Sequence, residues 1–331
     1  MIVKYFPFQP HCFAFGGFDM QMINALEAVR KQGIDASRMD IWSRDNCFDI
    51  LHLWGVDERN YQLIDWARKS NKKIVATLLL PYFGTFRSKI GTIYRKTCST
   101  KFKRQRFYYQ QLDQLVVVNE IQALVLENHF GVHASKISII PNIVENIFFE
   151  VPKTDFKKKY NLDDYILCTG NICSRKNQLN LALACSKINK PLVLIGKTLD
   201  GETEYGARLK KIIDSNENMV WIEELPKASD ELASAYYCCS VFALPSLDET
   251  QPISALEARC MNKKMVLLDR SYAHQSFYSD ALLASTPSPD AIAEALKKSF
   301  LVDQPNSAQL EICKEESVGL LYKECYNNLF K

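Results

Sequence analysis

The chain has 331 residues, of which 47% are hydrophobic and 24% charged, and its formal net charge at pH 7 is only +3. This length accommodates two hydrophobic cores, and the composition is ordinary for a globular protein. The small net charge gives no overall indication of nucleic-acid binding, and no apolar stretch approaches the roughly 20 residues of a membrane-spanning helix.

The cysteines and the amino terminus bear on the cellular compartment. The eleven cysteines are scattered and odd in number, and none forms a CxxC pair or a zinc-type spacing. This pattern indicates buried free thiols in a reducing compartment rather than disulfides or a metal site. Pro7 and Pro10 interrupt the apolar start of the chain, where only Lys4 is basic, so a signal peptide is not expected. We therefore expect a cytoplasmic protein, either soluble or attached to a membrane surface.

In the first half of the chain, short apolar runs alternate with stretches of helical periodicity. Strands are expected at residues 2–6, 49–53, 74–80, 115–118 and 137–140. A helix is expected where Phe18, Met22, Ala25, Leu26 and Val29 recur, and further helices at residues 61–69 and 121–128.

The second half repeats the same rhythm. Strands are expected at residues 166–170, 192–195, 220–222, 241–244 and 265–268, and helices at 179–188 and 205–215. Residues 310–330 have the pattern of a long closing helix. Because many strand runs are apolar without alternation, they are expected to be covered on both faces, as in parallel sheets with crossover helices.

The number of strands exceeds what one sheet would comfortably hold, so two doubly wound α/β domains are predicted. The boundary is expected in the polar, basic stretch 150–159, which contains Pro152. The predicted domains are residues 1–150 and 151–314, and the closing helix 315–331 is expected to return to the first domain.

The segments that follow the strands are the candidate binding sites, because ligands of open α/β sheets bind beyond the carboxyl ends of the strands. Gly16 and Gly17 follow the first strand and precede a helix, so backbone there could approach an anion closely. An ordinary turn explains these glycines equally well. After the strand at 166–170, the cations Arg175 and Lys176 suit a diphosphate, although a solvated pair would look the same.

The loop after the strand at 241–244 carries two carboxylates. Glu249 lies in the loop, the next helix is expected to begin near Pro252, and Glu257 lies in that helix. Both carboxylates could hold hydroxyl groups at the two ends of a ligand whose phosphates sit on the helix N–H groups. The alternative is a solvated loop residue and an unrelated residue on the helix surface.

Taken together and in this order, the segments resemble the GT-B glycosyltransferases of family four, the large retaining group. The Gly16-Gly17 loop is similar to the family's glycine-rich loop, residues 49–53 to its D-x-x-H strand, and residues 136–142 to its K-I-x-V-I-P-N-G segment. Residues 170–177 resemble G-R-x-x-x-x-K-N. Residues 245–257 resemble P-S-x-x-E with a second glutamate eight positions after the first, which is the most specific of these motifs.

The resemblance implies two Rossmann-like domains facing a cleft, an acceptor-side domain first and a nucleotide-sugar-binding domain second. It implies that Glu257 binds the ribose, Glu249 orients the transferred sugar, and Lys176 and Arg175 neutralise the diphosphate. It places the base near residues 221–225. The implied donor-binding residues are Gly16, Gly17, Asn171, Arg175, Lys176, Ile222, Glu223, Glu249, Thr250, Gln251, Pro252, Ile253, Ser254 and Glu257. Neither a metal nor another cofactor is implied, and the sequence contains no Asp-x-Asp triplet.

Some positions depart from the family pattern. Asn171 stands where the family often has arginine, Ile143 replaces a frequent glycine, and Thr250-Gln251-Pro252 replaces Gly-Phe-Gly. The histidine that many relatives carry after the strand at 74–80 is absent, which leaves His11 and His52 as candidates in this half. His52 is expected to be a packed strand residue.

The segment 87–106 contains eight Lys and Arg residues and no acid, and aromatic residues are interleaved among them. It suits anionic lipid headgroups or a lipid-diphosphate acceptor, whereas nothing else in the chain supports nucleic acid; a solvated helix face is the alternative. We therefore predict a retaining transfer of a hexose-type sugar to a saccharide acceptor, such as a lipid-linked intermediate of a surface polysaccharide or lipopolysaccharide. The alternatives are a catalytically silent nucleotide-sugar-binding subunit and a sugar-nucleotide epimerase of the same fold.

Overall fold

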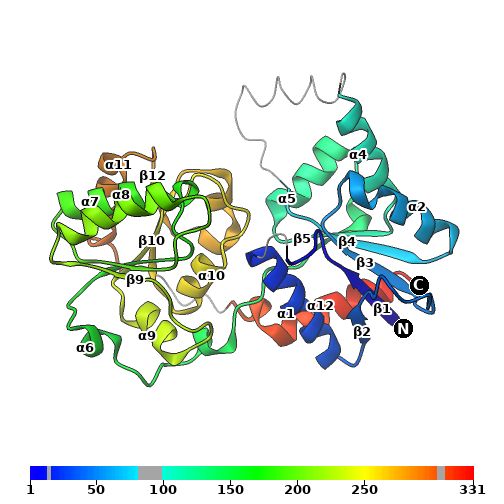
Figure 1. The fold of residues 1–331 in the computed structure, drawn as a ribbon, viewed down its shortest axis with the longest axis horizontal. Helices are drawn as coiled ribbons and strands as arrows, with labels where there is room; N and C mark the ends of the chain where they lie inside the picture. The colour runs from blue at the N-terminus through cyan, green and yellow to red at the C-terminus, as the bar shows by residue number, and fades with distance from the viewer. Residues whose placement is uncertain (13–15, 81–98, 304–309) are drawn as a thin grey trace. The chain divides into compact units, whose positions relative to one another are not determined.

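The computed structural model describes residues 1–12, 16–80, 99–303 and 310–331. These residues form two compact units (Figure 1). Unit 1 comprises residues 1–143 and 311–331, and unit 2 comprises residues 144–310. Each unit contains a six-stranded sheet with parallel pairing and helices on both faces, so the predicted α/β class and the two Rossmann-like folds are confirmed.

The sheet of unit 1 has the strand order β2-β1-β3-β4-β5-β6. Its strands are β1 (Ile2–Phe6), β2 (Asp35–Arg38), β3 (Ile50–Trp54), β4 (Lys73–Thr77), β5 (Gln114–Val117) and β6 (Ile137–Ile139). The edge strand β2 was not predicted, because its sequence Asp-Ala-Ser-Arg is short and polar and buries only Ala36 fully. It forms through backbone pairing with β1 rather than through an apolar pattern of its own.

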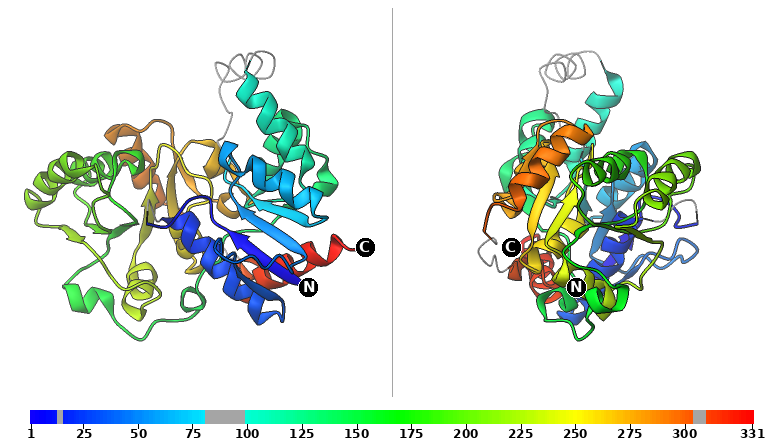
Figure 2. Two further views of the ribbon diagram at one scale, coloured as in Figure 1. Left: turned by 45° about the vertical axis from the view of Figure 1, so that its right-hand side comes forward. Right: turned by 90° about the vertical axis from the view of Figure 1, so that its left-hand side faces the viewer.

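The helices of unit 1 are α1 (Gly17–Lys31), α2 (Tyr61–Lys69), α4 (Thr100–Gln111), α5 (Glu120–Val125) and α12 (Glu315–Asn328). Apolar residues of α2, α4 and α5 pack with one face of the sheet, and those of α1 and α12 pack with the other. The closing helix thus belongs to unit 1, where it lies beside α1 (Figure 2). A side chain at Gly319 would lie 2.7 Å from the carbonyl oxygen of Ala28, so this glycine permits the close approach of the two helices.

A buried polar network fastens α12 to the sheet. His52 on β3 lies 2.7 Å from the Tyr326 hydroxyl through Nδ1 and 2.9 Å from Thr77 Oγ1 through Nε2. The Tyr326 hydroxyl also lies 2.7 Å from that of Tyr5, and Tyr322 bonds to Thr77. Burial lowers the pKa of His52 from 6.5 to about 3. Below pH 6.5 the unfolded chain binds a proton at His52, whereas the folded chain does not bind it until about pH 3. The free energy of unfolding therefore decreases as the pH falls from 6.5 toward 3.

Replacing Tyr326 with phenylalanine is expected to lower the free energy of unfolding by about 1–3 kcal/mol, because buried groups lose their hydrogen-bond partner. Urea denaturation followed by circular dichroism measures the change. Tyr237→Phe is the matched control, since that side chain is 45% exposed and should tolerate the loss of its hydroxyl. Equal stability of the Tyr326 variant and the control would show that the network contributes little.

The sheet of unit 2 has the strand order β12-β11-β10-β7-β8-β9. Its strands are β7 (Ile166–Thr169), β8 (Leu192–Ile195), β9 (Met219–Ile222), β10 (Val241–Leu244), β11 (Lys264–Leu268) and β12 (Leu282–Ala284). Its helices are α6 (Phe156–Tyr160), α7 (Gln178–Lys187), α8 (Thr203–Asp214), α9 (Asp230–Cys238), α10 (Ile253–Cys260) and α11 (Pro289–Ser299). Helices α7, α8 and α11 pack together on one face, and α6, α9 and α10 on the other (Figure 1).

The division between the units differs from the expected boundary near residue 150. It falls between Ile143 and Val144, because the short helical turn Asn146–Phe149 packs against α9 and α10 of unit 2. The Phe148 ring is fully buried there, edge-on to Tyr236 at 5.4 Å between ring centroids. The second division falls between residues 310 and 311, before the start of α12. None of the helices in the described ranges is long and apolar enough to cross a membrane.

Candidate functional site

The loop after β7 brings a lysine back over the end of its own strand. Gly170 has φ +116°, a conformation that favours glycine, and a side chain there would collide with the Lys176 amine. The turn Ser174–Lys176 follows, and Asn177 adopts the left-handed conformation before α7 begins. The backbone of this loop therefore holds the Lys176 ammonium close to the carboxyl end of the sheet, where ligands of such sheets bind.

Glu249 joins this loop to the loop after β10. Its Oε1 lies 2.8 Å from the Arg175 guanidinium and 3.8 Å from Lys176 Nζ, and it accepts a 3.2 Å hydrogen bond from Ser246. Arg175 also donates to the carbonyl of Asp248. The Glu249 and Lys176 side chains are each 13% exposed, so this ion pair is only partly screened by water. The structure thus brings the three residues predicted to be catalytic into one cluster.

Helix α10 begins beside this cluster. Pro252 is its N-cap residue rather than its first helical residue, which is Ile253. No side chain caps α10, and the N–H groups of a first helical turn have no partner within their helix. The Ser254 hydroxyl oxygen is buried and makes no hydrogen bond within the described chain. These groups together offer donors to an anion.

The loop before α10 is held in place by hydrogen bonds from Gln275, a residue that the sequence did not indicate. The buried Gln275 side chain donates to the Thr250 carbonyl at 2.7 Å and accepts from the Gln251 amide at 3.3 Å. Tyr278 donates to the Pro252 carbonyl at 3.3 Å. The Gln251 side chain, predicted to bind donor, is buried and occupied in this brace. These contacts fix the path of the backbone that leads into α10.

Glu257 lies one turn into α10 in a second polar cluster. Its Oε2 accepts a 2.5 Å hydrogen bond from the Tyr236 hydroxyl, which lies 2.5 Å from Thr169 Oγ1 at the end of β7. Burial raises the pKa of Glu257 from 4.5 to about 7, although the Tyr236 hydrogen bond and the Lys176 charge oppose this shift. This carboxylate is therefore held in a fixed orientation by α9 and β7, and nearby positive charge favours its ionised form.

The raised pKa of Glu257 predicts a stability that falls with rising pH. The folded carboxyl keeps its proton up to about pH 7, whereas the unfolded one releases it near pH 4.5. The contribution of Glu257 to the free energy of unfolding is therefore complete below pH 4.5 and is lost as the pH rises through about 7. Glu257→Gln should therefore match wild type in urea denaturation at pH 5 and exceed it at pH 8. Glu217→Gln, at an exposed position, should change neither value. A Glu257 variant that behaves alike at both pH values would contradict the prediction.

The residues predicted to lie near the base, 221–225, have side chains on both faces of the sheet. Trp221 and Glu223 line a cavity under α8, whereas Ile222, between them, does not. Adjacent residues of a strand point to opposite faces, so Ile222 and Glu223 do not line the same pocket. Asn171, the other predicted donor contact, lies in the β7 loop, where its carbonyl accepts from Gln178 at 2.9 Å.

In unit 1, the predicted glycine-rich loop is only partly described, because residues 13–15 lie outside the described ranges. Gly16 has extended backbone, and a side chain added there would meet nothing within 4 Å, so neither backbone strain nor crowding demands this glycine. Its N–H donates to the Asp19 carboxylate at 2.9 Å, and His11 Nε2 lies 3.6 Å from that carboxylate. Gly17 begins α1. His52 is buried in the polar network described above, as its predicted packing role requires.

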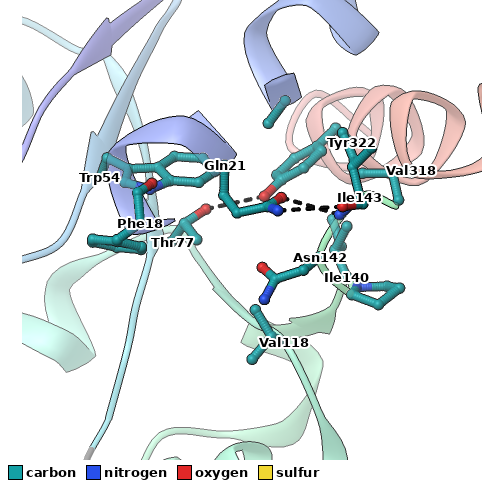
Figure 3. Close-up of a pocket in the computed structure, with 12 residues that line it drawn as sticks. Phe18, Gln21, Trp54, Thr77, Val118, Ile140, Asn142, Ile143, Val318 and Tyr322 are labelled. Atoms are coloured by element: carbon teal, nitrogen blue, oxygen red, sulfur yellow. Dashed lines mark hydrogen bonds between the residues drawn. The ribbon is translucent and has the colours of Figure 1, made fainter. Parts of the chain in front are cut away.

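A small cavity of about 10 Å³ lies at the carboxyl ends of β3 and β4 (Figure 3). Trp54, Thr77 and Tyr322 line it together with Gln21, whose side-chain amide bonds to both the N–H and the carbonyl of Ile143, at 3.0 and 3.3 Å. This volume admits at most one water molecule. The region thus serves to anchor Ile143, the last residue of the first segment of unit 1, to α1, and Gln21 carried no signal in the sequence.

Only part of the predicted basic segment can be placed. Residues 87–98 lie outside the described ranges, and the remaining cations lie on α4. Lys101 lies 3.9 Å from Glu58, and the Arg104 guanidinium lies 5.3 Å from the centre of the Tyr61 ring. Lys103 and Phe107 are exposed on the same side of the helix. This helix face therefore combines positive charge with an exposed aromatic ring.

Comparisons with solved structures define the class of fold, which is that of the GT-B glycosyltransferases. The chain is similar to sucrose-phosphate synthase from Thermosynechococcus elongatus, with a TM-score of 0.72 and 14% identity over 100% of this chain and 99% of that one. It is similar to Anabaena HepE in complex with UDP and glucose, with a TM-score of 0.68 and 11% identity over 100% of both chains. WaaG, a glycosyltransferase involved in lipopolysaccharide biosynthesis, gives a TM-score of 0.57 and 14% identity over 98% of this chain and 95% of that one.

At the level of sequence, residues 163–300 match the family of glycosyl transferases group 1. The matched segment begins just before β7 and ends after α11, so it contains Arg175, Lys176, Glu249 and Glu257. No curated protein sequence matches the chain.

Proposed function

We propose that this protein is a glycosyltransferase that transfers a hexose-type sugar from a nucleotide-diphosphate sugar to a saccharide acceptor. The observation that carries the proposal is the convergence of Arg175 and Lys176 on Glu249, in the loop that leads into the uncapped α10. The match of residues 163–300 to glycosyl transferases supports it, as does the likeness to a structure solved with UDP and glucose.

The donor diphosphate would occupy the cations and the start of α10. Lys176 supplies a point charge, Arg175 a planar fork, and Ile253 and Ser254 supply backbone N–H groups. The buried Ser254 hydroxyl gains a partner when phosphate binds, which removes an unsatisfied polar group. In the ligand-free protein Glu249 holds both cations, so a diphosphate competes with Glu249 for them and leaves its carboxylate to accept hydroxyls of the transferred sugar.

The ribose would bind at Glu257. One carboxylate oxygen accepts from Tyr236, and the other is available to accept from the vicinal hydroxyls of a ribose. The Lys227 charge favours the ionised form of this carboxylate, which places that lysine within electrostatic reach of the same pocket. Asn171 and the backbone of Thr250, Gln251 and Pro252 complete the proposed donor site.

In the reaction, the bond between the anomeric carbon and the diphosphate oxygen breaks, and the acceptor hydroxyl forms the new glycosidic bond. Its proton leaves with the nucleoside diphosphate, on the same face of the sugar, in a retaining transfer. Arg175, Lys176 and the α10 N–H groups stabilise the charge that develops on the diphosphate, and they are already in place before the reaction begins. The protein's main contribution is therefore the stabilisation of the leaving group.

The proposed acceptor is a lipid-linked saccharide of a surface polysaccharide, met at the cytoplasmic face of a membrane. The exposed cations of α4 support this, because Lys and Arg near a surface attract anionic headgroups. The combined change Lys101→Gln, Lys103→Gln and Arg106→Gln is expected to weaken co-sedimentation with phosphatidylglycerol vesicles. Lys157→Gln, Lys158→Gln and Lys159→Gln on α6, which together also remove three positive charges, form the charge control. Unchanged sedimentation of the α4 variant would contradict membrane binding through this helix.

The turnover of nucleotide sugars tests the proposed function. The full chain is incubated with UDP-, GDP-, ADP- and dTDP-hexoses, with and without a cell-envelope lipid extract, and release of nucleoside diphosphate is measured. Release with one donor, stimulated by the extract, is expected. Binding of a donor without release under any condition would favour a silent subunit, and interconversion of sugars without release would favour an epimerase.

A further inference from the structure

A second cavity lies in unit 2, on the face of the sheet covered by α8. Its volume is about 410 Å³, within the range of small-molecule sites in proteins. The loop from β8 to α8 contributes Thr198, Leu199, Asp200 and Gly201, the helix contributes Thr203, Gly206, Ala207 and Lys210, and β9 contributes Trp221 with Glu223 just beyond it. These residues come from consecutive elements of the chain, so their arrangement is fixed by unit 2 alone.

This cavity is separate from the candidate donor site. Glu257 accepts a hydrogen bond from Tyr236 of α9, so it lies on the face of the sheet covered by α9 and α10. Trp221 and Glu223 face α8 on the opposite side. Glu257 and Lys176 therefore do not line this cavity, although the loop after β7 bonds to its margin, where the Ser174 hydroxyl donates to Glu202 at 2.7 Å.

An aromatic ring held in a fixed position lines the cavity. Trp221 donates its indole N–H to the Gly196 carbonyl at 2.8 Å, which fixes the ring orientation. The ring is partly exposed to the cavity. A fixed, partly exposed indole face binds flat apolar surfaces at little cost in conformational entropy.

The polar rim offers acceptors and donors to an uncharged ligand. Asp200 and Glu223 are exposed, and neither carboxylate forms a hydrogen bond or an ion pair within the described chain. Thr198 and Thr203 add hydroxyl groups that donate and accept. Lys210 is the cation of the rim, and its ammonium lies 2.7 Å from Asp214 on the same helix.

The charges exclude several classes of ligand. Asp200 and Glu223 line the cavity, and Glu202 and Glu204 lie at the start of α8, so a phosphate or carboxylate is disfavoured despite the helix terminus. Because the Lys210 ammonium is paired with Asp214, the charges do not exclude an organic cation over the indole, and choline is therefore included in the test below. A ligand without polar groups would desolvate both free carboxylates without compensation.

We propose that this cavity binds a neutral saccharide, whose apolar ring face stacks on Trp221 and whose hydroxyls donate to Asp200 and Glu223. A sugar ring has one face of C–H groups and a rim of hydroxyls that donate and accept, which matches a cavity lined by an indole and by mixed polar groups. The site would hold a saccharide away from the reacting groups, as an exosite for a glycan. The cavity shares Trp221 and Glu223 with the region that the resemblance assigned to the base, so saccharides are compared with nucleosides in the test.

The indole N–H resonances of the chain provide the test. The sequence has four tryptophans, and the Trp221 resonance is assigned by its disappearance in Trp221→Phe. Glucose, galactose, mannose, N-acetylglucosamine, maltose and lactose are titrated separately into the full chain. At least one is expected to shift the Trp221 resonance in a saturable manner while the Trp42 resonance stays unchanged.

Variants distinguish this site from the donor site. Asp200→Asn with Glu223→Gln is expected to weaken saccharide binding by about tenfold or more, because two charge-assisted hydrogen bonds are lost. Ala207→Phe, which fills the cavity, should abolish the shift. Glu224→Gln, a neighbouring carboxylate paired with Lys197, and Glu257→Ala should leave it unchanged.

Three outcomes would overturn the proposal. They are the absence of a saturable shift with every saccharide, an equal shift after the Ala207→Phe change, and a shift produced by uridine, guanosine or choline but by no saccharide. If the Glu257→Ala variant fails to bind donor but still binds saccharide, the result concerns the proposed donor site alone and leaves this proposal standing.

Discussion

Replacing Lys176 with alanine is expected to lower the turnover of the nucleotide sugar by about 10²–10³-fold, the usual effect of removing one preorganised group that stabilises developing charge. The ammonium is held over Gly170, 3.8 Å from Glu249, and its side chain is only 13% exposed. In the alanine variant, water at this mostly buried position would stabilise the departing diphosphate less than the ammonium does. The rate of nucleoside diphosphate release from the preferred donor, measured in wild type and variant, checks this expectation.

The control for this experiment is Lys187→Ala. That lysine is exposed on α7 and pairs with Asp290, so its loss changes the net charge of unit 2 equally but leaves the loop after β7 intact. Turnover by the control should match wild type. A Lys176 variant as active as the control would remove the leaving-group role from this loop and with it the main support for the proposed chemistry.

Glu249→Gln is expected to separate donor binding from turnover. The carboxylate competes with a diphosphate for Arg175 and Lys176, so its removal should leave the affinity for the nucleoside diphosphate unchanged or higher. Turnover should fall by about 10²-fold, because the transferred sugar loses a charged acceptor that orients it. Isothermal titration calorimetry with the nucleoside diphosphate and the release assay with the full donor measure the two quantities.

Asp248→Asn is the matched control for Glu249. It neutralises the adjacent carboxylate, and the contact that Asp248 makes with Arg175 uses its backbone carbonyl rather than its side chain. Affinity and turnover should both stay close to wild type. Parallel losses of affinity and turnover in Glu249→Gln would mean that this glutamate organises the loop and does not act on the sugar.

The fold could be predicted from the sequence because most strands carry continuous apolar runs. Residues 50–54, 166–169 and 241–244 are buried throughout, and such runs do not depend on context to be recognised. The edge strands β2 and β12 were missed because their residues are polar or only partly buried. The division between the units was misplaced because the turn Asn146–Phe149 is fixed by long-range packing of Phe148 against Tyr236.

The candidate site was predictable to the level of its loops but not of its contacts. Arg175, Lys176 and Glu249 were identified from their positions after strands, and the structure brings them together. The support of Glu257 by Tyr236, and of Thr250 and Gln251 by Gln275, joins residues separated by more than 20 positions. Such pairs depend on tertiary packing, which a single sequence does not reveal.

The most direct test of the account is whether unit 2 holds a nucleotide sugar at Glu257. Thermal shifts are measured for wild type and Glu257→Ala with UDP-, GDP-, ADP- and dTDP-sugars, because a ligand that binds the native state raises the melting temperature by mass action. We predict a shift with one class of nucleotide that is lost in the variant, while circular dichroism shows that the variant is folded without ligand. The absence of a shift with every nucleotide sugar, from well-folded wild type, would contradict it.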